Sequence, residues 1–305
     1  MPMGRRLRRS MLFVPGNNPS MILNAPVFCP DSIILDLEDA VSINQKDAAR
    51  ELLVQALRTL NFAACEIVIR INGRHTPFAV DDIAAMVPAR PHVLRLAMTE
   101  QAEDIIWADE LVTKLEAENE IEPGSIKLMA AIETAKGVLN ASEIATASRR
   151  LVAMSFGAED FTNSIHSERT ADGFELLAAR STIVLAARAA NIDPIDTVYS
   201  KVDDDEGFIK DALRAKQMGF AGKSCIHPRQ VELVHKVFRP SGDEIQRAIA
   251  VMSAIQEAEK RGSGVVSVDG HMVDGPIVMK AQRVLQLAQA AGLTNGGIPN
   301  DNGNE

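Results

Sequence analysis

Residues 127–161, KLMAAIETAKGVLNASEIATASRRLVAMSFGAEDF, contain the pattern that decides the fold. Two short apolar runs, at 127–132 and 151–156, flank a stretch of helical periodicity at 135–148. Both runs are apolar almost throughout, which is typical of parallel strands buried on both faces rather than of half-exposed antiparallel strands. The stretch therefore predicts a strand–helix–strand unit whose strands run parallel.

The same alternation continues in both directions along the chain. Apolar or β-branched runs predict strands at 11–14, 32–35, 66–71, 93–96, 127–132, 151–156, 197–199 and 222–226. Helical patterns between them lie at 46–60, 101–117, 135–148, 173–190 and 206–218. Eight strands favour an α/β fold of the (β/α)8 TIM barrel type over a doubly wound open sheet. The doubly wound alternative also lacks a G-x-G-x-x-G loop after the first strand.

The chain continues beyond the eighth predicted strand. A helix is expected at 241–261, because Ser241 and Glu244 form a capping-box pattern, and a second helix begins at Pro276. These helices are not needed to close a barrel. We predict a catalytic barrel domain at 1–238, a C-terminal helical extension at 239–292 that packs on a neighbouring subunit, and a disordered tail at 293–305.

Composition excludes several classes of protein. The formal charge of −9, without a basic stripe, argues against a nucleic-acid partner. No apolar run is long enough to cross a bilayer, and no apolar signal segment follows the Arg-rich start, so we expect a cytoplasmic protein. Cys29, Cys65 and Cys225 have no metal-ligand spacing and are expected to be reduced thiols.

Active sites of such barrels lie at the C-terminal ends of the strands, and several acids follow those ends here. Glu38 and Asp39, in LDLEDAV, are candidate catalytic acids after the second strand. Glu133 ends the fifth strand and Asp160 follows the sixth. Two carboxylates from adjacent strands, with water and substrate oxygens, suit a half-site for Mg²⁺. The alternative is that these acids cap helices or pair with arginines.

Three basic residues are further candidates. Arg70 is expected at the barrel mouth, where it can grip a substrate carboxylate, form salt bridges to the LEDAV acids, or do both. Lys223 raises the alternative of a Schiff-base mechanism, but it opens its strand and is better explained as structural. His227 can act as a general base or, with Pro228 after it, set a strand-to-helix turn.

Several motifs together resemble a known family. RRSMLFVPGNN, IILDLEDAV, VIRING, AAIETAKGVLNA, FGAEDF, GFAGKSCIHPRQ and DGHMVDGP occur in this order. They resemble the citrate lyase β subunits, which belong to the wider HpcH/HpaI aldolase family that includes malyl-CoA and citramalyl-CoA lyases. The resemblance covers nearly the whole chain.

The resemblance implies a barrel that uses Mg²⁺ to cleave a citryl thioester, carried by CoA or an acyl carrier protein, to oxaloacetate and an acetyl thioester. It implies that Glu133 and Asp160 ligate Mg²⁺, that Glu133 also borders the substrate, and that Arg70 binds a substrate carboxylate. Asp274, in MVDGP, matches a catalytic acid that a neighbouring subunit supplies. A homo-oligomer, trimer or hexamer, is implied, together with a transferase subunit and an acyl carrier protein as partners.

One position departs from the family pattern. Relatives carry Pro-Lys after the fourth strand, whereas this chain has Ala97 and Met98. Arg95 is expected not to replace the missing charge, because strand alternation directs it away from the mouth. Two alternatives therefore stay open: a stand-alone citramalyl-CoA or malyl-CoA lyase, and a catalytically weakened barrel that serves as a scaffold or binding subunit.

Overall fold

The structure, a computed structural model, describes residues 6–62, 65–261, 267–268, 271–295 and 298–299. It divides into two compact units: Arg8–Val237 forms one, and the residues on either side form the other. No helix of the described residues is long and apolar enough to cross a membrane.

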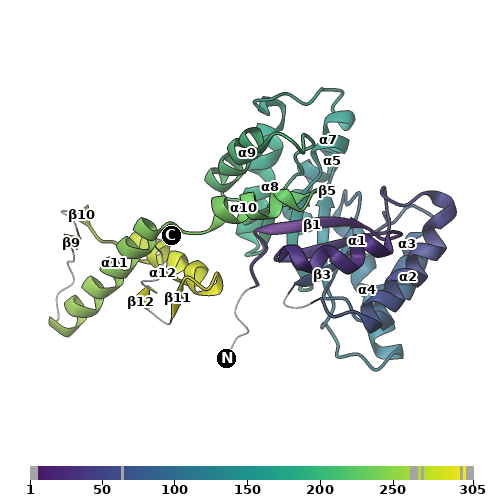
Figure 1. The fold of residues 1–305 in the computed structure, drawn as a ribbon, viewed down its shortest axis with the longest axis horizontal. Coiled ribbons are helices and arrows are strands. Elements are labelled where there is room, and N and C mark those ends of the chain that lie inside the picture. The colour runs from purple at the N-terminus through teal and green to yellow at the C-terminus, as the bar shows by residue number, and fades with distance from the viewer. Residues whose placement is uncertain (1–5, 63–64, 262–266, 269–270, 296–297, 300–305) are drawn as a thin grey trace. The chain divides into compact units, whose positions relative to one another are not determined.

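The larger unit contains a closed barrel, so the predicted (β/α)8 fold is confirmed (Figure 1). Each strand pairs in parallel with the next, and β1 pairs with β8. The strands of the barrel are β1 (Ser10–Pro15), β2 (Ser32–Asp36), β3 (Glu66–Ile71), β4 (Val93–Leu96), β5 (Lys127–Ile132), β6 (Leu151–Phe156), β7 (Asp193–Asp196) and β8 (Gly222–Cys225).

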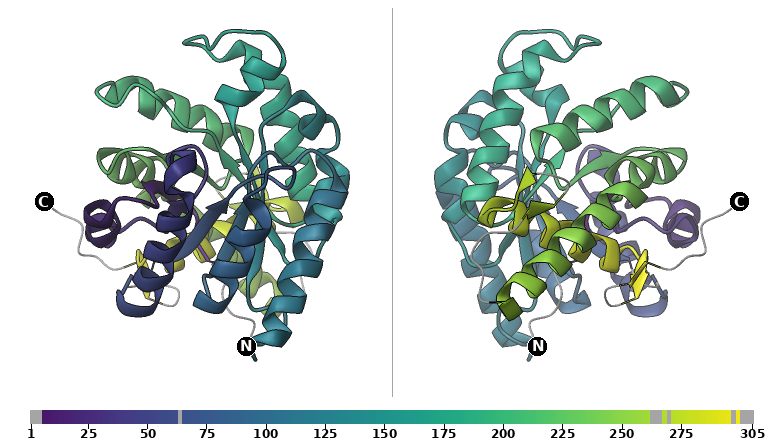
Figure 2. Two further views of the ribbon diagram at one scale, coloured as in Figure 1. Left: turned by 90° about the vertical axis from the view of Figure 1, so that its right-hand side faces the viewer. Right: turned by 90° about the vertical axis from the view of Figure 1, so that its left-hand side faces the viewer.

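Helices surround the barrel on its outer side (Figure 2). They are α1 (Pro19–Asn24), α2 (Lys46–Thr59), α3 (Ala79–Met86), α4 (Ala102–Glu118), α5 (Ala135–Leu139), α6 (Ala141–Thr146), α7 (Ala158–Ser164), α8 (Leu177–Ala189), α9 (Asp205–Met218) and α10 (Arg229–Phe238). Short 3₁₀ helices occupy Ala25–Phe28, Ile43–Gln45, Val87–Ala89 and Phe174–Leu176. The sequence pattern did not indicate α1, α3, α7 or α10.

The barrel interior is packed in layers, and this places the site. One buried layer consists of Met11, Ile34, Val68, Val93, Met129, Ala153 and Ile195, one residue from each of seven strands. Side chains of a strand alternate between its faces, so the residue two positions further along points the same way. On β1 to β4 those next inward residues are Phe13, Asp36, Arg70 and Arg95. The core thus gives way to charged side chains at the C-terminal end of the barrel.

The seventh strand was predicted wrongly at 197–199, because it is formed by Asp193–Asp196 instead. Its sequence, DPID, lacks the apolar run that indicates a buried strand. The two aspartates are nevertheless buried, because Asp193 pairs with Arg8 at 2.9 Å and Asp196 pairs with Arg180 at 2.9 Å. These long-range ion pairs take the place of the apolar side chains that the pattern requires.

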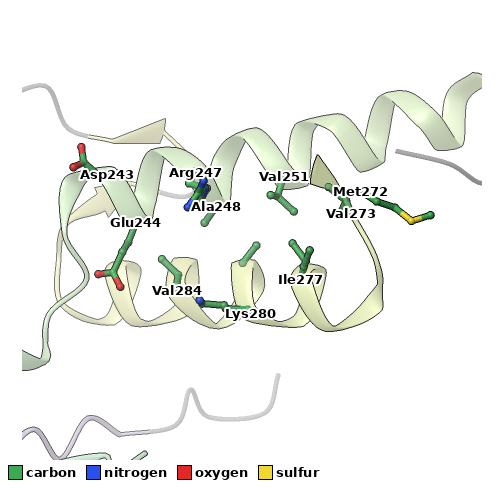
Figure 3. Close-up of a pocket in the computed structure, with 11 residues that line it drawn as sticks. Asp243, Glu244, Arg247, Ala248, Val251, Met272, Val273, Ile277, Lys280 and Val284 are labelled. Carbon is green, nitrogen blue, oxygen red and sulfur yellow. The ribbon is translucent and has the colours of Figure 1, made fainter. Parts of the chain in front are cut away.

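The second unit is built on two helices, α11 (Gly242–Arg261) and α12 (Gly275–Ala290). It also contains two short antiparallel strand pairs: β9 (Ser267–Val268) pairs with β10 (His271–Met272), and β11 (Thr294–Asn295) pairs with β12 (Ile298–Pro299). The predicted capping box is present, since Ser241 and Glu244 exchange hydrogen bonds of 2.8 and 3.1 Å. A pocket of about 720 Å³ lies between the helices, and Val251, Ile277 and Val284 point into it (Figure 3). Residues 296–297 and 300–305 of the predicted tail lie outside the described residues.

Candidate active site

A buried ion pair between Asp36 and Arg70 anchors one side of the barrel mouth. Arg70 donates from Nε and Nη2 to the two carboxylate oxygens of Asp36, both at 2.6 Å. Asp36 also accepts hydrogen bonds from the backbone N–H groups of Glu38 and Ala40. Burial raises the pKa of Asp36, but the hydrogen bonds and charge of Arg70 outweigh it, so the pKa is lowered. Asp36 therefore acts as a fixed counterion for Arg70.

Glu38 and Asp39 share the remaining side of the Arg70 guanidinium. Arg70 Nη1 lies 2.7 Å from Glu38 Oε2 and 3.4 Å from Asp39 Oδ2. Glu38 Oε2 is buried and, despite the short distance, has no hydrogen-bond geometry with any described group. Burial raises the pKa of Glu38 to about 8, against the charge of Arg70, and the neighbouring carboxylates add to the rise. Glu38 is thus a carboxyl whose proton can be exchanged near neutral pH.

Glu133 follows β5 and is held on two sides. Its Oε2 accepts a 2.8 Å hydrogen bond from the backbone N–H of Met98, and its Oε1 lies 3.8 Å from Arg95 Nη2. The side chain is buried and lies against Gly157, where an added Cβ would come within 2.5 Å of Glu133 Cγ. Met98 presents its N–H from a backbone with φ of 52°, a conformation uncommon for residues other than glycine.

Asp160 lies in the first turn of α7, directly after β6. Its side chain is open to solvent and has no hydrogen bond or ion pair with another residue of the described ranges. Although Asp160 is exposed, neighbouring groups displace part of the water around its carboxyl, and this partial desolvation raises its pKa. The negative charges of Glu133 and Asp39 raise the pKa further, and the charge of Arg70 opposes the rise only in part. Asp160 therefore faces other acids without a cationic partner of its own.

These acids fit a divalent cation held mainly by non-protein oxygens. No group of three or more ligand-type side chains able to hold a metal exists within the described ranges. Mg²⁺, however, often binds through one or two carboxylates and keeps waters or substrate oxygens for its other positions. Among the described groups of the site, five carboxyls outnumber the guanidinium groups of Arg70 and Arg95 and the ammonium of Lys46. Glu133 and Asp160 follow the neighbouring strands β5 and β6. These two side chains are the ones that would hold the ion.

We expect Gly157→Ala to weaken Mg²⁺ binding by about 10- to 100-fold without unfolding the barrel, because Gly157 borders Glu133 and leaves room for its side chain. The new Cβ collides with Glu133, whereas the φ of −108° at Gly157 suits any residue. Calorimetric titration with Mg²⁺ measures the effect. Gly242→Ala is the matched control, because a Cβ there meets nothing within 4 Å. Equal affinities in the two variants would contradict the placement of Glu133.

Three further candidates from the sequence have surroundings of their own. Lys223 is fully buried at β8, where Nζ donates to Asp196, Asp211 and the Thr197 carbonyl, so it has a structural environment. His227 Nδ1 accepts the backbone N–H of Arg229 at the turn into α10. Asp274 is the N-cap of α12 in the other unit and accepts from the Ile277 N–H at 3.2 Å.

Arg95 corrects one expectation. The alternation of side chains along the strand predicts that Arg95 points away from the mouth. In the structure, however, Arg95 and Arg70 are register partners on β4 and β3, and both face inward. The guanidinium carbons of both lie 5.0 Å from the centroid of the Phe13 ring. Burial, partly offset by the charge of Glu133, lowers the pKa of Arg95 to about 10. Sequence reasoning missed Phe13, Gly157 and the Met98 N–H entirely.

The chain is also similar to known proteins. Residues 9–228 match the model of the family described as HpcH/HpaI aldolase/citrate lyase. The chain belongs to this family. Membership in the HpcH/HpaI aldolase/citrate lyase family makes it a carbon–carbon lyase.

Individual members of the HpcH/HpaI family are similar over nearly their whole length. The chain is 49% identical over 290 residues to citrate lyase subunit beta of Leuconostoc mesenteroides subsp. cremoris, covering 95% of this chain and 96% of the relative. The structure of CitE from Mycobacterium tuberculosis in complex with magnesium, acetoacetate and coenzyme A matches with a TM-score of 0.74 and 32% identity, covering 94% of this chain and 99% of that one. A citrate lyase beta subunit from M. tuberculosis complexed with oxaloacetate and magnesium matches with a TM-score of 0.66 and 32% identity, covering 77% and 99%.

Proposed function

We propose that this chain cleaves a citryl thioester to oxaloacetate and an acetyl thioester with the help of Mg²⁺, as the β subunit of a citrate lyase. The observation that carries the proposal is the pair Glu133 and Asp160, two carboxylates that follow neighbouring strands within a site that has an excess of negative charge. The identity of 49% to a citrate lyase subunit beta supports the choice of substrate class.

The residues of the site have distinct roles in this reaction. Bound Mg²⁺ would acidify the substrate hydroxyl and stabilise the negative charge that develops as the carbon–carbon bond breaks. Glu133 and Asp160 hold the ion. Arg70 binds a substrate carboxylate through Nη1, where the exposed Asp39 at 3.4 Å is its weakest and most easily displaced partner. Fixing that carboxylate reduces the orientational entropy lost on reaching the transition state.

Two proton transfers accompany bond cleavage. The hydroxyl proton leaves as the ketone of oxaloacetate forms, and the enolate of the thioester takes a proton on carbon. Glu38 suits the first transfer, because its pKa of about 8 lies near neutral pH. Burial is the main cause of that high pKa, and the negative charges of Glu133 and Asp39 add to it. For the second transfer we propose Asp274 of a neighbouring subunit, which makes a homo-oligomer, trimeric or hexameric, part of the proposal.

The test is to assay the purified chain with citryl-CoA and citramalyl-CoA, with Mg²⁺ or with EDTA. We expect Mg²⁺-dependent release of oxaloacetate from citryl-CoA. Release should be faster when an acyl carrier protein, with the transferase subunit present, carries the citryl group in place of CoA. Preference for citramalyl-CoA would favour a stand-alone lyase instead. Failure to turn over either thioester with Mg²⁺ would contradict the proposal.

Met98 motivates the scaffold alternative, and the same assay decides it. The side chain of Met98 is 42% exposed, and its backbone N–H already serves Glu133. Turnover that appears only after Met98→Lys would favour a weakened barrel. An active wild type that gains nothing from Met98→Lys would dismiss that alternative.

A further inference from the structure

Arg95 is a buried cation with unused hydrogen-bond donors. It is 2% exposed, and its Nε and Nη1 have no hydrogen-bond partner among the described residues. Buried guanidinium groups normally have partners for their N–H groups, because an unmatched charged donor is costly away from water. The nearest acid, Glu133, lies 3.8 Å from Nη2, which is beyond hydrogen-bond distance. Arg95 therefore has donors available that the folded chain does not use.

Arg70 differs from Arg95 although the two occupy paired positions on β3 and β4. Arg70 Nε and Nη2 both donate to Asp36, and Nη1 lies close to Glu38 and Asp39. Among the described partners of Arg70, Asp39 is the most distant and the most exposed, so we expect a ligand carboxylate to reach Arg70 by displacing Asp39. A second anionic group of the same ligand has to find its donors elsewhere in the site.

Arg95 lies where such a group would be placed. Its guanidinium and that of Arg70 both stand 5.0 Å from the centre of the Phe13 ring, so the two cations belong to one cluster at the barrel mouth. Glu133, the proposed metal ligand, borders Arg95 on the side of the carboxyl cluster. A ligand that binds beside Glu133 therefore comes next to the unused N–H groups of Arg95.

We propose that Arg95 selects dicarboxylates, by donating Nη1–H and Nη2–H, the parallel pair at the end of its guanidinium, to the second carboxylate of a 2-oxo or 2-hydroxy acid whose first carboxylate is bound by Arg70. This inference rests on the proposed function and adds to it a residue that distinguishes oxaloacetate from a monocarboxylate such as pyruvate. A guanidinium suits this role, because its fixed fork matches the planar carboxylate.

Calorimetry with the full chain and saturating Mg²⁺ tests the proposal. Freshly dissolved oxaloacetate and pyruvate are the two probes, since they differ by one carboxylate. We expect the wild type to bind oxaloacetate about 10- to 100-fold more tightly, the range for a charge-assisted hydrogen bond. In Arg95→Met we expect the ratio of oxaloacetate affinity to pyruvate affinity to fall to within about threefold of one, with the affinity for pyruvate unchanged. In Arg95→Lys we expect an intermediate ratio, because lysine keeps the positive charge but lacks the parallel N–H groups of the guanidinium.

Arg74→Met is the matched control. Arg74 also follows a barrel strand, but it pairs with Asp104 at 3.3 Å and lies over the ring of Trp107, so the same substitution there leaves the ratio unchanged. An unchanged affinity ratio in Arg95→Met overturns the inference. An equal loss of affinity for oxaloacetate and pyruvate also overturns it, because it would mean that Arg95 acts through Glu133. If Arg95→Met does not fold, an unchanged ratio in Arg95→Lys overturns it. A wild type that binds neither probe refutes the proposed function itself.

Discussion

Glu133→Gln is expected to reduce kcat/KM for citryl-thioester cleavage by about 10²- to 10³-fold, as the loss of one group that stabilises transition-state charge does. In the wild type, Glu133 Oε2 accepts a 2.8 Å hydrogen bond from the Met98 N–H. Glutamine keeps the size of the side chain, and its amide oxygen can accept the same hydrogen bond. What it removes is the negative charge that holds the cation. Mg²⁺ affinity should therefore fall together with turnover, which calorimetry and the oxaloacetate-release assay measure on the same preparation.

Glu100→Gln is the control for this variant. Glu100 is a carboxyl at the same end of the barrel, but it accepts from Thr134 Oγ1 at 2.9 Å and pairs with Lys136 at 3.3 Å. We expect near wild-type turnover from it. Because Glu133 and Asp160 act on one ion, Asp160→Asn should resemble Glu133→Gln, and the double variant should lose little more than either. Wild-type Mg²⁺ affinity in Glu133→Gln would refute the metal site.

The sequence indicated the barrel correctly because its signal is local. Runs such as residues 151–156 show burial on both faces, and alternation with helices is enough to indicate parallel strands. Glu133 and Asp160 were found by the same means, since each directly follows such a run. The rule that barrel sites lie at the C-terminal strand ends then supplied their common location.

Other features were not local and were therefore missed. Residues 93–96, VLRL, are buried on both faces, so their own pattern does not reveal which face looks into the barrel. Only the register of β4 with β3 places Arg95 beside Arg70. The role of Met98 is likewise carried by a backbone N–H, which every residue except proline has. The strand at Asp193–Asp196 stayed hidden because its aspartates are buried through ion pairs with residues distant in sequence.

Lys223→Met is expected to destabilise the fold by about 3–5 kcal/mol, the range for breaking a buried ion pair on one side. Lys223 Nζ lies 2.7 Å from Asp196 and 2.6 Å from Asp211, and none of its side chain is exposed. Without it, Arg180 alone faces both acids, and one buried negative charge is left unmatched. Urea unfolding measures the loss. Trapping of a substrate on Lys223 with borohydride would contradict this structural role.

Lys236→Met is the matched control, because Lys236 is exposed on α10 and pairs with Glu232 within one helix turn, where water screens the contact and it contributes little to stability.

The pH dependence of unfolding adds an independent check. Burial raises the pKa of Asp211, but Lys223 and Arg180 outweigh it and lower the pKa to about 2. Because the pKa of Asp211 is lower in the folded chain than in the unfolded chain, where it is near 4, ionised Asp211 stabilises the folded state above pH 4. This stabilisation is lost as the pH falls towards 2. Lys223→Met removes part of that lowering, so its deficit relative to wild type should narrow between pH 4 and 2. A deficit that stays constant over this range would mean that Lys223 stabilises the barrel by packing rather than through the charge of Asp211.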